Sequence, residues 1–205
     1  MIIRDRKSTV YSEKNRLLGN CFTIKKDIEF HYEFDIRGFE ALIICDNLVY
    51  INEAIEEFRK YNKYISVYYN EDRSFYKAYD EIHTFKLPIN IIQPTEFFIN
   101  EENLSNISKL LEDKEVYLPV NILNDEYVLL DGHTRLYAKY LEDCKMVNVY
   151  IDEMDDKIDD LVYMAKEQNI HNIKALKTLN NEEYNEYLKF INSIHEIWKR
   201  GIKLL

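Results

Sequence analysis

The sequence predicts an α/β protein of the α+β type, with a small mixed sheet and its helices formed by the middle of the chain. Residues 28–36 alternate apolar and polar side chains, which is typical of a half-buried strand. The middle of the chain alternates short apolar runs with helical patterns, and the C-terminal part has helical periodicity. We therefore expect a mixed α/β region over residues 1–86, a compact unit over 87–152 and a helical segment over 153–205.

The N-terminal region is expected to contain several strands and one helix. Asp46-Asn47 separates two apolar runs and is a plausible two-residue hairpin turn. Asn52 is suited to cap the helix that follows. The expected strands are 28–36, 41–45, 48–51 and 64–69, the expected helix is 53–61, and residues 74–86 remain unassigned.

The central unit has clearer signals. A short apolar run ends at Pro94, which cannot donate to a strand ladder. Asn100 precedes Glu101 and Glu102, a favourable start for a helix. Asn124-Asp125 predicts a turn between two strands. The expected strands are 89–92, 120–123, 127–130 and 146–151, with helices beginning near 101 and after Gly132.

The C-terminal segment is expected to form two helices. One covers about residues 155–168, and Asn180 with Glu183 resembles a capping box at the start of the second. An apolar stripe continues through this second helix to Trp198. Core packing is the common role of such a stripe, and a homodimer through the C-terminal helix is the alternative.

The composition indicates a globular protein. It is 46% hydrophobic and 31% charged, and no apolar run approaches the roughly 20 residues that span a bilayer. The N-terminus has no apolar signal segment, so we expect a cytoplasmic protein without a membrane partner. Cys21, Cys45 and Cys144 are too far apart to suggest a disulfide framework or a metal pair.

The charge argues against a nucleic-acid partner. The whole chain carries −10, and residues 87–152 hold 12 acidic and 5 basic side chains, a net −7. Binding a phosphate backbone requires clustered Lys and Arg that displace counterions. We therefore expect neither DNA nor RNA to be a partner of this chain.

The strongest chemical signal is the junction Asp131-Gly132-His133-Thr134-Arg135. A strand that turns through glycine into a helix presents free backbone N–H groups at the positive end of the helix dipole. Gly132 permits close approach of a phosphate, and the Arg135 guanidinium and His133 ring add donors. Thr134 offers a hydroxyl, and Asp131 is suited to cap the helix or to hold a divalent ion.

The order of strand, Pro, helix, Pro-strand, turn, strand, Gly-His-x-Arg, helix and strand resembles the ParB/sulfiredoxin superfamily. Residues 127–136 carry most of the resemblance, which covers about 65 residues. It implies that the turn binds nucleotide phosphates, as it binds ATP in sulfiredoxins and CTP in ParB proteins. His133 stands where sulfiredoxins carry their nucleophilic cysteine, and residues 93–98 lack the arginine of the ParB box.

The free-serine kinases of this superfamily are the nearest branch. They resemble the chain at Asp-Gly-His-x-Arg and at a Pro-x-Glu after the first strand, here Pro94-Thr95-Glu96. The resemblance implies that Glu96 is the general base in a kinase that uses ATP or another nucleotide with Mg²⁺ on a small hydroxyl substrate such as serine. The alternative is a nucleotide-binding regulatory or interaction protein without chemistry.

Overall fold

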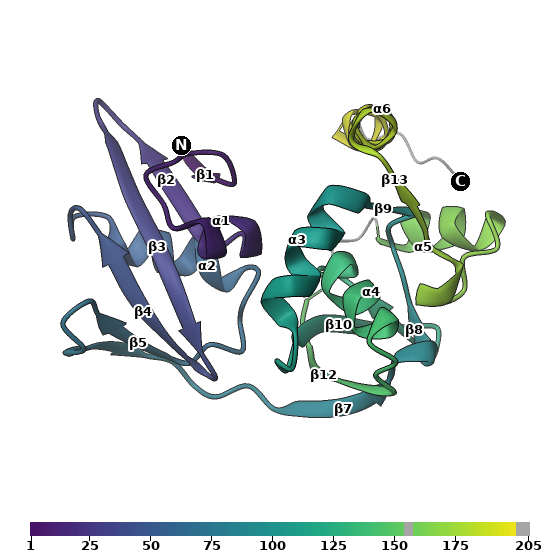
Figure 1. Cartoon of the computed structure of the whole chain (residues 1–205), viewed down its shortest axis with the longest axis horizontal. Coiled ribbons are helices and arrows are strands. Elements are labelled where there is room, and N and C mark those ends of the chain that lie inside the picture. The colour runs from purple at the N-terminus through teal and green to yellow at the C-terminus, as the bar shows by residue number, and fades with distance from the viewer. Residues whose placement is uncertain (154–157, 200–205) are drawn as a thin grey trace. The chain divides into compact units, whose positions relative to one another are not determined.

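The computed structural model describes residues 1–153 and 158–199 and has a mixed α/β architecture. The chain divides into two compact units, Met1–His83 and Thr84–Leu205. Figure 1 shows their elements along the chain. In the described residues no helix is both long and apolar enough to cross a membrane.

The N-terminal unit is built on a six-stranded sheet whose strands follow the order β1-β2-β3-β4-β5-β6. Every neighbouring pair is antiparallel except β4 with β5, which is parallel. The strands are β1 (Ile2–Arg4), β2 (Cys21–Lys25), β3 (Glu29–Arg37), β4 (Glu40–Cys45), β5 (Val67–Asn70) and β6 (Phe75–Ala78), and the helices are α1 (Glu13–Leu18) and α2 (Ile51–Arg59).

Different elements pack against the two faces of this sheet. On one face, the Phe58 ring of α2 packs against Phe22, Phe34 and Tyr68 of β2, β3 and β5. On the other face, the buried carboxylate of Glu33 accepts hydrogen bonds from the backbone of Ser12 and from the side chain of Asn15. The segment that leads into α1 and α1 itself are thereby fixed to this second face.

The structure confirms the strand expected at 28–36, which is β3, but not a strand at 48–51. β4 instead turns back from β3 through Gly38, whose φ is +66°, and pairs with β5 on its other side. Ile51 is buried as the first residue of α2, whereas Leu48 and Val49 are exposed in the preceding turn. An apolar run therefore marked the approach to a helix rather than a strand.

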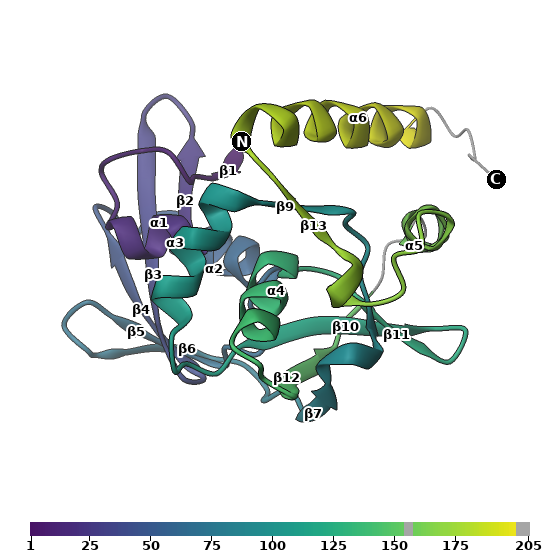
Figure 2. The same ribbon diagram turned by 45° about the vertical axis from the view of Figure 1, so that its right-hand side comes forward.

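The second unit contains a five-stranded mixed sheet in the order β7-β12-β10-β11-β8. Figure 2 shows α3 and α4 above this sheet, where the two helices contact each other. The strands are β7 (Thr84–Pro88), β8 (Ile92–Gln93), β9 (Phe98–Asn100), β10 (Tyr117–Leu123), β11 (Glu126–Leu129), β12 (Met146–Ile151) and β13 (Lys177–Leu179). The helices are α3 (Glu101–Leu111), α4 (His133–Leu141), α5 (Ile158–Glu167) and α6 (Asn181–Lys199).

Local signals in the middle of the chain are confirmed. The strand expected at 146–151 is β12, and the Asn100 side chain caps α3 by accepting from the Asn103 N–H at 2.8 Å. Asn124 and Asp125 both have positive φ, +50° and +63°, in the turn between antiparallel β10 and β11. Asn and Asp tolerate this left-handed region better than other non-glycine residues.

The expected strand at 89–92 is largely wrong. Residues 89–91 form a 3₁₀ turn, and only Ile92 and Gln93 remain as β8. The preceding strand is β7, which pairs antiparallel with β12 and moves the start of the unit from the expected residue 87 to Thr84. The Ile89 N–H donates to the Lys145 carbonyl at 3.0 Å and continues the antiparallel register of β7 with β12, so the chain leaves this ladder only after Ile89.

The C-terminal elements belong to this same unit. Asn180 Oδ1 accepts from the Glu182 and Glu183 N–H groups at 3.0 and 3.1 Å, which confirms the expected start of α6. β13 pairs in parallel with β9, a contact that the sequence did not indicate. The first expected helix is found as α5; its first residues, including Asp155-Asp156, and the Trp198 side chain lie outside the described residues.

Candidate functional site

The turn into α4 has the backbone geometry of an anion site. Gly132 is the N-cap residue with φ +89° and ψ +28°, and no side chain caps the helix. The first backbone bond of the helix runs from the Leu136 N–H to the Gly132 carbonyl at 2.9 Å. The N–H groups of residues 133–135 therefore precede any intrahelical acceptor and lie at the positive end of the helix dipole.

Gly132 is required here for both conformation and space. A Cβ on this residue would lie 2.7 Å from the Leu118 Cδ2 atom and 2.8 Å from the Nε and Nη2 atoms of Arg135. The Arg135 guanidinium therefore lies directly over the glycine backbone. Any larger residue would combine a steric conflict with a φ that L-residues rarely adopt.

Asp131 and Arg135 flank the glycine as a pair. Arg135 Nη2 donates to Asp131 Oδ2 at 2.9 Å, and the two side chains are 18% and 36% exposed. Asp131 therefore holds the guanidinium rather than capping the helix. Thr134 is half-buried in the first turn of α4. The structure thus brings Asp131, Gly132 and Arg135 together at one helix start.

His133 has a different position from the one expected of a phosphate donor. Its ring is 2% exposed, and its Nε2 atom accepts from the backbone N–H groups of Thr95 and Glu96 at 2.9 and 3.2 Å. Because Nε2 accepts two hydrogen bonds, it carries no proton, and the proton of the neutral ring lies on Nδ1. Burial lowers the pKa of His133 to about 4, so the ring is neutral at physiological pH. His133 therefore fastens the 94–96 loop to the start of α4.

Glu96 is placed beside this histidine. Its Oε1 atom lies 3.4 Å from His133 Nδ1, and 41% of its side chain is exposed. The separation is within ion-pair range, but the Nδ1 atom makes no hydrogen bond of acceptable geometry among the described residues. Because the ring is neutral, we interpret the pair as a close polar approach rather than a salt bridge. The Glu96 carboxylate is thus next to the first residue of α4 and open to solvent.

Three further residues position the loop that carries Glu96. The Thr95 hydroxyl donates to the Leu129 carbonyl at 3.0 Å, which joins the loop to the end of β11. The Tyr187 hydroxyl of α6 accepts from the Phe97 N–H at 3.2 Å. Gln93 Nε2 donates to the carbonyls of Pro94 and Ile170 at 2.8 and 2.9 Å.

Sequence reasoning missed these positioning residues. Tyr187 belongs to the apolar stripe of the C-terminal helix, and its place in that stripe indicates burial but not a partner. Thr95 and Gln93 look like ordinary loop residues in the sequence. Only the folded structure shows that backbone groups of the 94–97 loop meet acceptors from both α4 and α6.

A preformed metal cage is not present in the described part of the chain. There, no group of three or more His, Cys, Asp or Glu side chains is arranged to hold a metal ion. Asp131 is the carboxylate at the start of α4, and it is already bonded to Arg135.

Two solved structures show a distant likeness to the chain. Protein Atu1540 from Agrobacterium tumefaciens is 15% identical with a TM-score of 0.37, over 49% of this chain and 64% of that one. The C-terminally truncated chromosome-partitioning protein ParB from Caulobacter crescentus, complexed with CTP-gamma-S, is 22% identical with a TM-score of 0.32, over 43% of this chain and 53% of that one. This chain thus spans less than two thirds of either protein.

No protein-family model matches the sequence, and no curated protein matches it significantly. The distant structural similarities carry no functional assignment, so the roles of the site residues rest on their own geometry.

Proposed function

We propose that the start of α4 binds the terminal phosphates of a nucleotide. The single observation that carries this proposal is the uncapped helix start behind a left-handed glycine, with the Arg135 guanidinium folded over that glycine. Backbone N–H groups, a helix dipole and a planar cation then converge on one position. The sequence resemblance to nucleotide-binding turns supports the same ligand class.

Binding requires Arg135 to change partner in whole or in part. Its Nη2 atom now donates to Asp131, and a phosphate oxygen would compete for the same guanidinium. Asp131 would then supply one of the carboxylate ligands that Mg²⁺ takes alongside phosphate oxygens. ATP or another nucleotide with Mg²⁺ fits this donor set, and the ion would supply neutralisation of phosphate charge.

We further propose that Glu96 makes the site a phosphotransferase for a small hydroxyl compound such as free serine. In the transfer step, the substrate hydroxyl oxygen forms a bond to the terminal phosphorus while the bond to the leaving nucleoside diphosphate breaks. The hydroxyl proton passes to the Glu96 carboxylate. Phosphoryl transfer needs mainly positioning and charge neutralisation, with one group to accept the proton.

The position of Glu96 supports this role. His133 is the first residue of α4. Its ring accepts a hydrogen bond from the Glu96 N–H and lies close to the Glu96 carboxylate, so Glu96 is held next to the proposed phosphate-binding turn. Because the His133 ring is neutral, it does not tie up the carboxylate in an ion pair.

A second candidate is a nucleotide-binding module without chemistry. The specific observation in its favour is the 3.4 Å approach of Glu96 Oε1 to the Nδ1 atom of His133. A carboxylate in that position orients a buried histidine even if it never meets a substrate. Glu96 would then be a positioning residue for the loop.

Nucleotide consumption with and without hydroxy amino acids distinguishes these two functions. We expect the full chain to hydrolyse or transfer little phosphate from ATP alone and to form a phosphorylated product when serine is added. The Glu96→Gln variant should lose product formation, whereas Glu167→Gln, which alters an exposed glutamate of α5, should not. Nucleotide binding without product for any hydroxyl substrate would favour the module.

A further inference from the structure

The N-terminal unit has a hollow on the sheet face opposite α2. Its volume is about 240 Å³. The register places Arg37 opposite Glu40 and Leu42 opposite Tyr69, so these side chains share one face. The hollow is lined by Arg37, Glu40, Ala41, Leu42, Tyr69 and Arg73.

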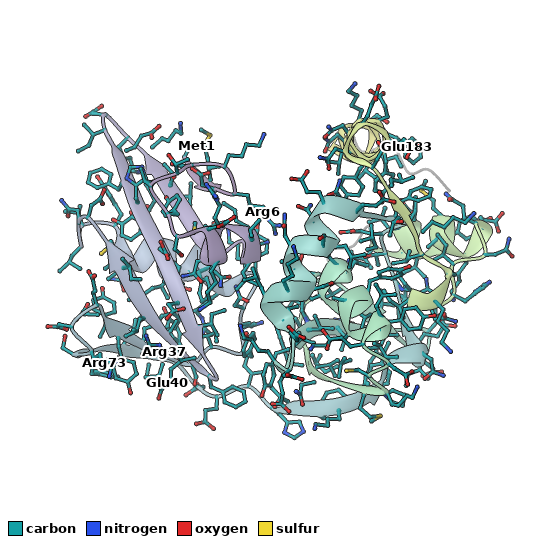
Figure 3. All side chains as sticks on the ribbon, viewed as in Figure 1. Met1, Arg6, Arg37, Glu40, Arg73 and Glu183 are labelled. Atoms are coloured by element: carbon teal, nitrogen blue, oxygen red, sulfur yellow. The ribbon has the colours of Figure 1, made fainter. Side chains whose placement is uncertain are left out.

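The helix on this face covers only the neighbouring part of the sheet. α1 is joined to the sheet through Glu33 and through the Lys14–Asp35 ion pair at 2.6 Å. Leu42 of β4 lies directly opposite Asp35, and Tyr69 of β5 lies opposite Leu42; both side chains are half-buried. Figure 3 shows Arg37, Glu40 and Arg73 gathered at the same end of the unit.

Two opposite charges face this hollow without partners. Arg37 is already engaged, because its Nε and Nη2 atoms donate to Asp35 Oδ2 at 3.3 and 3.2 Å. Within the described part of the chain, neither the Arg73 guanidinium nor the Glu40 carboxylate makes an ion pair or a side-chain hydrogen bond. The hollow therefore offers one free cation and one free anion above an apolar floor.

The turn that carries Arg73 is firmly held. Asn70 N–H donates to the Ser74 carbonyl at 2.9 Å, and the Asp72 carboxylate accepts from the Ser74 N–H at 2.8 Å. Arg73 itself has φ +67°, a left-handed conformation that non-glycine residues rarely adopt. The base of the arginine is thus fixed at the edge of the hollow.

We propose that this hollow binds a free α-amino acid with an apolar side chain. The Arg73 guanidinium would take the carboxylate in a two-point hydrogen bond, and Glu40 would take the ammonium group. The side chain would lie on Leu42 and Tyr69. A simple organic anion would meet repulsion from Glu40 and a simple amine repulsion from Arg73, whereas a zwitterion satisfies both.

Calorimetry on the full chain tests this proposal with matched probes. Phenylalanine, 3-phenylpropionate and 2-phenylethylamine share one ring but differ in their charged groups. We expect phenylalanine to bind at least tenfold more tightly than either half-molecule. Arg73→Gln and Glu40→Gln should each weaken phenylalanine binding at least tenfold, and Glu40→Gln should bring phenylalanine and 3-phenylpropionate close to equal affinity.

Arg6→Gln is the matched control, because the Arg6 guanidinium lies beside Gly19 rather than in the hollow. Its phenylalanine affinity should equal that of the wild type. Since the substituted residues are exposed, unchanged thermal melts will verify folding of all variants. Absence of saturable phenylalanine binding, equal binding of 3-phenylpropionate to the wild type, or unchanged affinity in both hollow variants would each overturn the proposal.

Discussion

Replacing His133 tests whether a neutral, buried imidazole holds the Glu96 loop to α4. In the His133→Gln variant, the amide oxygen can reach the position of Nε2 and accept from the Thr95 and Glu96 N–H groups, but the side chain no longer titrates. In the His133→Phe variant, both donors lose their acceptor. Each unpaired N–H costs about 1–3 kcal/mol of stability when it is buried.

The pH dependence follows from the lowered pKa. The folded-state pKa of His133 is about 4, below its ordinary value of 6.5, so the unfolded chain binds the proton more readily. The stabilisation is complete above pH 6.5 and is lost as the pH falls towards 4. Between pH 7.5 and pH 5 the wild type should lose about 2 kcal/mol that His133→Gln does not lose.

Urea unfolding at pH 7.5 and pH 5, followed by circular dichroism, measures this difference. Carboxylates titrate in both proteins and cancel in the comparison. His171→Gln controls for removal of an exposed imidazole. Parallel pH curves for the wild type and His133→Gln would refute the neutral buried ring, and equal losses in the Gln and Phe variants would refute the acceptor role of Nε2.

Three other measurements test the Gly132 turn, the role of Glu96 and the charge of residues 87–152. Gly132→Ala should destabilise the protein by about 1–3 kcal/mol in thermal or urea unfolding, because φ +89° and the 2.7 Å approach to Leu118 oppose a Cβ. Unchanged stability would show that residue 132 tolerates a Cβ without strain. Glu96→Gln should leave nucleotide affinity intact while kcat falls by roughly 10²–10⁴, and an equal loss of affinity would indicate a binding role instead. DNA should show no binding in gel-shift assays at physiological salt, even with CTP, because residues 87–152 carry −7; salt-sensitive submicromolar binding would revive a partition-protein function.

The parts of the fold that the sequence predicted depend on local chemistry. Asn100 caps α3 because its side chain reaches an N–H three residues away, and Asn124-Asp125 turns because both residues tolerate positive φ. Glu183 meets Asn180 across a single helical turn. Each of these signals is complete within a few residues, so it can be recognised without the rest of the chain.

The missed elements depend on partners far away in the sequence. β13 exists because Lys177–Leu179 pairs with β9, and β7 because Thr84–Pro88 pairs with β12. Neither segment has a distinctive pattern of its own. The apolar run at 48–51 shows the same limit, because periodicity cannot distinguish a short strand from the approach to a helix.

The candidate site was predicted at the level of its backbone and less well at its side chains. The Gly132 turn opens α4 where the junction indicated, whereas the pairing of Asp131 with Arg135 was not anticipated. The inward orientation of His133 was not evident, because residue type does not reveal that Nε2 meets two N–H groups from residues 95 and 96. That orientation is also what brings Glu96 to the turn.

Calorimetry of Mg-nucleotide with the wild type, Arg135→Ala and Arg135→Lys tests whether the start of α4 binds nucleotide phosphates. We expect saturable binding to the wild type and a tenfold to hundredfold loss in Arg135→Ala, equivalent to about 1.5–3 kcal/mol for a charge-assisted hydrogen bond. Arg135→Lys, which keeps the charge but not the two-point donor, should be intermediate. Absence of binding to the wild type, or equal affinity in all three proteins, would contradict the claim.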